Sequence, residues 1–153
     1  MRRLKYKKGR KVHSSTLEYT GVHKDTRTEI QLFVYDAHDV KEFQQLVPNN
    51  ISKSIDESKV NWLNIHGLNE PELIAEIGEK FGADSFIIGD ILNTTKRTKL
   101  EEYHDILFFN VKSLLPIENS NTISYEQISF ILKDTVLISF QEKRSDFFTY
   151  IRE

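Results

Sequence analysis

The stretch VNWLNIHGLNEPELIAEIGEKFG, residues 60–82, decides the fold, because in it a strand leads directly into a helix. Its first six residues, VNWLNI, form a compact β-type run that ends at His66-Gly67. Asn69 and Glu72 then have the spacing of a capping pair, and Gly82 stands where a helix C-cap belongs. Between the caps, four apolar residues recur on one helical face: Leu73, Ile74, Ile77 and Phe81.

Other elements are predicted on both sides of this unit. Upstream, residues 16–21 and 28–35 alternate like the strands of a hairpin, and residues 38–46 have helical spacing. A second helix is predicted from Asp84 and a terminal one from Ser145. Three β-rich runs lie between these helices, at residues 104–115, 122–132 and 135–140.

This order of elements predicts a mixed sheet layered between helices, an α/β (α+β) fold. The length of 153 residues suits one domain, with 39% hydrophobic and 29% charged residues as in ordinary soluble proteins. We expect residues 1–15 to form a basic N-terminal tail and residues 16–153 a single α/β domain. Apolar runs such as 106–109 are far shorter than the roughly 20 residues of a membrane helix.

Charge is distributed unevenly along the chain. Of its 21 Lys and Arg residues, seven lie within the first twelve positions, so the rest of the chain is acidic. An acidic body suits cations and is a poor surface for nucleic acid, so no nucleic-acid partner is expected. We favour a solvated tail, with contact to phosphates or anionic lipid as the alternative.

Signatures of catalysis are missing from the sequence. It has no cysteine, which excludes disulfides and thiolate metal sites, and its five histidines show no metal-ligand spacing. No nucleophile elbow, phosphate-binding glycine loop or calcium loop is found. We therefore predict that the chain is not an enzyme.

The predicted helix at residues 85–93 carries one conspicuous carboxylate. Its isoleucines and Leu92 fall on one arc, and four other residues fall on the opposite arc: Phe86, Gly89, Asp90 and Asn93. Asp90 is thus expected to face outward beside a glycine, which costs helix stability and suggests close approach by another group. From spacing alone, a solvated aspartate is the favoured interpretation.

Five motifs together resemble the CorA magnesium-transporter family. They are WLNIHG at 62–67, FG at 81–82, DILN at 90–93, KLE at 99–101 and LISFQE at 137–142. The resemblance runs from about Thr16 to the end of the chain and covers the family's N-terminal cytoplasmic domain. The family's Gly-Met-Asn pore motif is not in this chain.

The resemblance implies a function and a site. Five copies would form a homopentamer whose funnel lies at the cytoplasmic face of the cell membrane, with the helix from Ser145 beginning a truncated stalk. Asp90 would be a ligand of a regulatory Mg²⁺ that holds the channel closed, and Phe86, Gly89 and Asn93 would line the subunit contact. Magnesium or cobalt would be the transported ion. The fragment itself is expected to be soluble.

At one position the chain departs from part of the family. Members with a second regulatory ion have Glu just before the sensor aspartate, whereas here Gly89 offers no ligand, so we expect no second site. Without the stalk, Mg²⁺ binding is expected to be weak, about millimolar or worse, and the fragment a monomer or weak oligomer.

Two alternatives stay open. One is the matching domain of a zinc or cobalt transporter, although the absence of cysteine favours a hard cation. The other is a soluble module that binds anions or nucleic acid through the basic N-terminal arm together with Lys96, Arg97 and Lys99.

Overall fold

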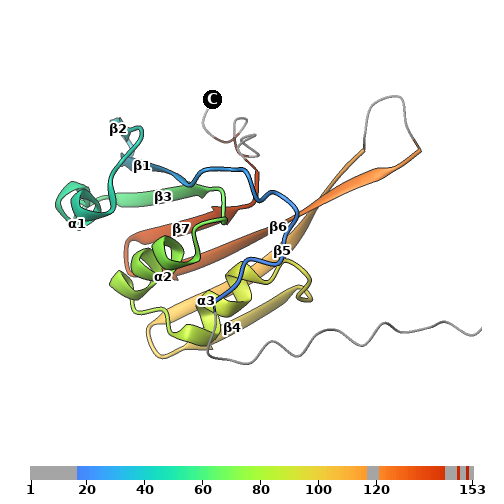
Figure 1. Cartoon of the computed structure of the whole chain (residues 1–153). Coiled ribbons are helices and arrows are strands. Elements are labelled where there is room, and N and C mark those ends of the chain that lie inside the picture. Colours follow the sequence, from blue (N-terminus) through green and yellow to red (C-terminus); the bar gives the residue numbers. More distant parts are fainter. Residues whose placement is uncertain (1–16, 117–120, 144–147, 149–150, 152–153) are drawn as a thin grey trace, which may run out of the picture.

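The fold is built around one mixed seven-stranded sheet, with strands in the order β2-β1-β3-β7-β6-β5-β4 (Figure 1). This computed structural model describes residues 17–116, 121–143, 148 and 151. The strands are β1 Glu29–Tyr35, β2 Val40–Phe43, β3 Val60–His66, β4 Lys99–Tyr103, β5 Ile106–Pro116, β6 Ile123–Lys133 and β7 Val136–Gln141. The helices are the 3-10 turn η1 Pro48–Asn50 and the α-helices α1 Ile51–Ser54, α2 Pro71–Lys80 and α3 Ser85–Leu92.

Strand β3 lies near the centre of the sheet and has β7 as its parallel neighbour. All other strand pairs are antiparallel, which makes the sheet mixed as predicted. Beyond the helices, the β5–β6 hairpin extends as a long arm (Figure 1).

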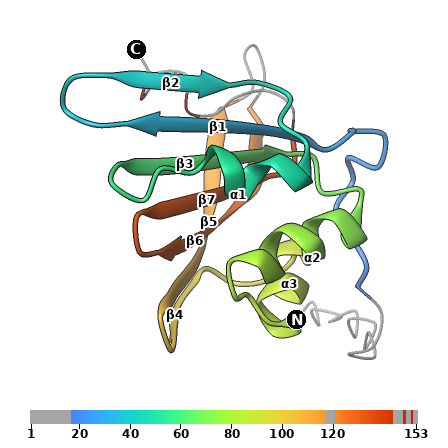
Figure 2. The same ribbon diagram turned by 90° about the vertical axis from the view of Figure 1, so that its left-hand side faces the viewer.

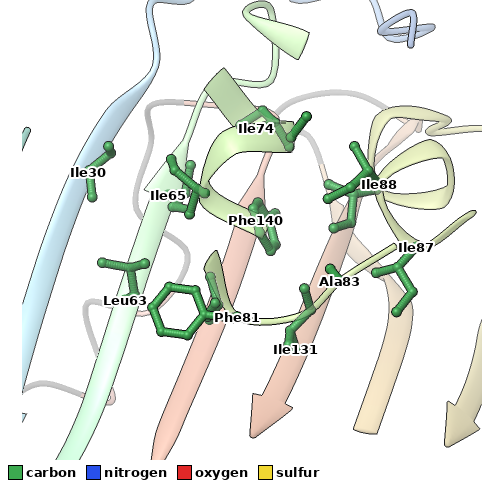
Figure 3. Close-up of a cluster of buried hydrophobic side chains, with 14 of the residues drawn as sticks. Ile30, Leu63, Ile65, Ile74, Phe81, Ala83, Ile87, Ile88, Ile131 and Phe140 are labelled. Carbon is green, nitrogen blue, oxygen red and sulfur yellow. The ribbon is translucent and has the colours of Figure 1, made fainter. Parts of the chain in front are cut away.

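Helices α2 and α3 cover one face of the sheet (Figure 2). Alternate residues of β3, such as Leu63 and Ile65, point to this face and are fully buried, because a strand turns every second side chain to the same side. They meet Ile74 of α2 and Ile88 of α3, with Phe140 of β7 beneath the helices (Figure 3). This cluster is the main core.

The opposite face of the sheet carries a smaller aromatic cluster. The rings of Phe33 and Trp62 lie 5.4 Å apart, and the Trp62 and Phe148 rings meet edge-on at 5.3 Å. Ile128 completes the buried set. Among the described residues, no helix forms a second layer over this face.

Two elements predicted in the N-terminal part of the domain are wrong. Residues 17–21 form no strand, and Val40–Phe43, predicted as part of a helix, is the strand β2 that pairs with β1. The cause is a tight turn, in which the Asp36 carboxylate accepts hydrogen bonds from the amides of His38 and Asp39. This local turn returns the chain onto β1 before a helix can begin.

A second error concerns β4, which the sequence analysis did not predict. The β-run expected at residues 104–115 corresponds to β5 alone, and β4 precedes it, joined to β5 by a turn in which His104 adopts a positive φ of 51°. Strand β4 alternates half-buried and exposed residues at the edge of the sheet. Its pattern is short and highly charged, so pairing with β5 is what makes it a strand.

The strand–helix unit at residues 60–82 forms as predicted, with one local difference. Helix α2 begins at Pro71 with Glu70 as N-cap residue, and Asn69 makes no side-chain cap. The Glu70 carboxylate instead accepts a hydrogen bond from the Thr28 amide at 2.8 Å. Gly82 follows the helix with a φ of +85°, the left-handed conformation expected of a C-cap glycine.

The fold class is therefore confirmed. Two other expectations concern residues that the structure does not describe. The basic tail and most of the helix predicted from Ser145 lie outside the described residues. In the part of the chain that is described, no helix is long and apolar enough to cross a membrane.

Candidate functional site

Helix α3 presents the carboxylate that the sequence analysis singled out. The side chain of Asp84 caps the helix, accepting from the amides of Phe86 and Ile87 at 2.9 Å each. The isoleucines and Leu92 bury the inner face in the main core, as predicted. Asp90 lies in the last turn of the helix, two residues before its end.

Asp90 does not face solvent, and this prediction is wrong. Only 8% of the residue is exposed, and both of its oxygens are engaged. The Lys96 ammonium lies 2.9 Å from Oδ1, and Lys99 forms an ion pair with Oδ2. The reason is strand β4, which was not predicted. Its first residue is Lys99, and this strand places the Lys99 side chain against the Asp90 carboxylate of α3.

The ion pairs extend beyond Asp90 along β4. Lys99 also pairs with Glu101, whose carboxylate accepts a hydrogen bond from the Tyr103 hydroxyl. Two carboxylates thus face two ammonium groups, and the formal charges of the cluster balance. We call Asp90, Lys96, Lys99 and Glu101 the ion-pair cluster.

The backbone at the end of α3 is held by the sheet and by the N-terminal segment. Gln127 of β6 donates its amide to the carbonyls of Asp90 and Asn93, at 3.1 and 3.3 Å. On the other side, the Thr20 amide donates to the Leu92 carbonyl at 3.0 Å. Because these contacts fix the helix end, the Asp90 carboxylate has a defined position.

The three residues predicted to line the subunit contact lie around Asp90 and differ in exposure and in their hydrogen bonds. Phe86 is 71% exposed, which is unusual for so large an apolar side chain. Gly89 is half-buried, and a Cβ added to it would meet nothing within 4 Å, so packing within the chain does not require a glycine. Asn93 ends the helix and accepts hydrogen bonds through Oδ1 from Thr95 and Thr20.

The residues at Asp90 fit a hydrated divalent cation on one condition. Mg²⁺ keeps several waters and needs only one or two protein carboxylates, and Asp90 supplies one. Within the described residues, no group of three or more acidic or histidine side chains could hold a metal. Both Asp90 oxygens already accept from lysines, so a cation must displace at least one ammonium.

The pKa of Asp90 is set by burial and by these lysines. Burial raises the pKa, but hydrogen bonds from Lys99 and Lys96 outweigh it, so the pKa lies below the ordinary aspartate value. For Lys99, burial lowers the pKa, while its bonds to Asp90 and Glu101 raise it well above the ordinary value. Asp90 and Lys99 are therefore both ionised at neutral pH.

This ionisation makes the stability conferred by Asp90 dependent on pH. A carboxylate with a depressed folded-state pKa stabilises above its unfolded-state value of about 3.9, and this contribution is lost as the pH falls through the folded value. We expect Asp90→Asn to lower the free energy of unfolding by about 1 kcal/mol at neutral pH. Urea denaturation at several pH values should show the difference shrinking below about pH 4.

Asp105→Asn is the matched control, because Asp105 pairs with Lys133 at an exposed site at 2.8 Å. Its effect should be smaller, since solvent screens that pair. A loss for Asp90→Asn that stays constant down to about pH 3 would show that charge is not its cause.

Lys96 and Lys99 were not predicted as partners of Asp90. Both lysines were expected, with Arg97, to belong to a possible anion-binding patch, but in the structure they form the ion-pair cluster. The alternation of KLEEY at residues 99–103 was the available signal, because it places Lys99 and Glu101 on the same face of one strand.

Comparison with known proteins gives a consistent result. Residues 57–153 match the sequence model of the family described as CorA-like Mg²⁺ transporter protein. The cobalt/magnesium transport protein CorA of Thermotoga maritima is 32% identical over 152 residues, 99% of this chain. That alignment spans 42% of the relative, so the chain corresponds to less than half of that protein.

Solved structures share the fold. The ZntB cytoplasmic domain from Vibrio parahaemolyticus superposes with a TM-score of 0.61 at 14% identity, over 83% of this chain and 49% of that one. The soluble domain of CorA from Methanocaldococcus jannaschii gives 0.52 at 14% identity, over 72% and 39%. At these identities the likeness establishes the fold alone.

Proposed function

The chain belongs to the CorA family of Mg²⁺ transporters, and on that premise we propose that it is the divalent-cation-sensing and gating domain of such a transporter. The family consists of ion transporters and not of enzymes, in agreement with the predicted absence of catalysis. In this proposal the domain lies at the cytoplasmic face of the membrane, and the whole protein transports Mg²⁺ or Co²⁺.

The sensing proposal rests on one observation, namely that the carboxylate of Asp90 is both buried and ionised. A carboxylate that is almost fully covered, yet balanced in part by the half-exposed side chain of Lys96, offers a place for a cation. We propose Asp90 as the metal ligand, supplying one carboxylate to a Mg²⁺ that retains most of its waters. A second ligand would come from a neighbouring subunit.

The surface next to Asp90 supports a subunit contact. Phe86 exposes most of its ring on the same helix, and the position of Gly89 leaves space above the backbone. We propose that Phe86, Gly89 and Asn93 face a second copy of the chain in a homopentamer. A cation shared between the copies would then hold them together, and its loss would loosen the contact.

The proposed extent of the domain follows the same reasoning. Residues 16–153 would form the sensing domain, with residues 145–153 beginning the stalk helix that leads to the membrane. Residues 1–15 would be a solvated basic tail, which has the charge to approach anionic lipid.

The experiment is limited proteolysis of the full-length transporter across a Mg²⁺ titration. We expect Mg²⁺ to protect the wild-type protein, and Asp90→Asn to shift the midpoint of protection about tenfold or more to higher Mg²⁺, because a neutral amide is a poorer ligand. Asp105→Asn, which removes a carboxylate elsewhere, should keep the wild-type midpoint. Identical midpoints for wild type and Asp90→Asn would refute Asp90 as the ligand.

The zinc-transporter alternative draws support from the ZntB-like fold, which the family shares. Uptake of Mg²⁺ and Zn²⁺ by the full-length protein would separate the two. The anion-binding alternative loses support, because Lys96 and Lys99, two of the three basic residues that it uses outside the N-terminal arm, are paired with acids.

A further inference from the structure

The two lysines that hold Asp90 are not equivalent. Lys99 makes three contacts within the chain, pairing with Asp90 and Glu101 and lying 5.3 Å above the ring of Phe108. Its side chain is 26% exposed. The Lys96 side chain is 47% exposed, and Asp90 is the acid with which it pairs. Lys99 is therefore anchored, whereas Lys96 is free to turn into solvent.

We infer that Lys96 is a tethered counterion that competes with the divalent cation for Asp90 and sets the cation concentration at which the site responds. This inference rests on the proposed function, since it concerns the same carboxylate. The Lys96 ammonium lies 2.9 Å from Oδ1 of Asp90, the position that the cation would take. The arriving cation displaces it, and Lys96 rotates into solvent while Lys99 stays with Glu101.

Electrostatics requires this exchange. A hydrated divalent cation and an ammonium group cannot both lie against one carboxylate oxygen without strong repulsion, because the cluster is partly shielded from solvent. The negative charges of Asp90 and Glu101 balance the positive charges of Lys96 and Lys99. A divalent cation added to this neutral cluster would leave two uncompensated positive charges beside a buried carboxylate. Release of Lys96 relieves part of that excess.

The backbone keeps the competitor close. The Lys96 amide donates to the Asn93 carbonyl at 3.2 Å, in the turn that directly follows α3. An ammonium held by so short a connection has a high effective concentration at Asp90, and this weakens the apparent affinity for any cation in solution. A variant without this ammonium should bind Mg²⁺ more tightly.

The test is a Mg²⁺ titration of the 153-residue chain at constant ionic strength, followed by the ¹⁵N–¹H shifts of the Asp90 and Ile91 amides. We expect Lys96→Gln to lower the dissociation constant for Mg²⁺ by about threefold to tenfold. Lys96→Arg keeps the charge and should stay near wild type. Lys133→Gln removes the same charge from the pair with Asp105 and should also leave the constant unchanged.

The outcomes separate this inference from the proposed function. If Asp90→Asn weakens Mg²⁺ binding and Lys96→Gln does not tighten it, the competition is refuted while Asp90 remains the ligand. If Asp90→Asn leaves the binding unchanged, the proposed function fails and the inference with it. If no variant shows saturable shifts up to roughly 50 mM Mg²⁺, where screening becomes strong, the inference is overturned.

Discussion

Replacing Phe140 by alanine is expected to lower the free energy of unfolding by about 3–5 kcal/mol, because the variant leaves a cavity in the main core. Phe140 is fully buried on β7 beneath the helices (Figure 3). It lies opposite Ile65 of β3 in the parallel pair and opposite Ser129 of β6. The Phe140 ring fills the space above three adjacent strands. Because their backbones are held together by hydrogen bonds, the neighbouring residues cannot easily move in to fill the cavity that its removal leaves.

Urea denaturation followed by circular dichroism would measure this change. Phe86→Ala is the control, since it removes the same side chain from a position that is mostly exposed. It should alter the free energy of unfolding by less than about 0.5 kcal/mol. A loss below about 1 kcal/mol for Phe140→Ala would contradict the packing described here.

Replacing Asn64 by alanine is expected to cost about 2–4 kcal/mol, because one side chain there holds several buried polar groups. Its Oδ1 accepts from the Ser139 hydroxyl at 2.7 Å and from the Gln141 amide at 2.9 Å. The Ser139 oxygen in turn accepts from the Trp62 indole at 2.9 Å. All of these groups are buried between β3 and β7.

Asn64 also orients His66. The Asn64 amide lies 2.8 Å from His66 Nε2, and His66 Nδ1 lies 3.1 Å from the Lys143 carbonyl. With the amide as donor to Nε2, the ring is neutral and its Nδ1 proton points to that carbonyl. Asn64→Ala removes this donor, and the histidine loses one of the bonds that select its tautomer.

Gln31→Ala serves as the comparison for Asn64→Ala. Gln31 contacts the Asn64 amide at a long 3.4 Å and is only half-buried, so its loss should cost about 0.5 kcal/mol or less. Chemical denaturation of both variants would test the difference. Equal effects for the two would show that the polar groups beneath the sheet do not act as one network.

How much the sequence predicts differs from element to element. The unit of β3 and α2 and the helix from Asp84 were predicted because each combines an apolar period with a residue that marks a helix end, Gly82 after α2 and Asp84 before α3. Strands β6 and β7 were predicted for the same reason. Membership of the CorA family, predicted from motifs, is confirmed by the family match.

The two edge strands were not predicted, and both failures follow from one physical cause. Strands β2 and β4 are short and rich in charge, so their residues alone do not specify a strand. The hydrogen bonds of β1 and β5 make them strands. Pairing between segments is a tertiary property, which a local pattern does not contain.

The sequence by itself determined the fold class, the apolar faces of α2 and α3, and the presence of a carboxylate at position 90. Only the tertiary structure decided what that carboxylate meets. Strand β4 brings Lys99 beside Asp90, and the turn after α3 brings Lys96 to its other oxygen. The charge environment of Asp90 depends on distances in space, and a helical period specifies only the direction in which its side chain leaves the helix.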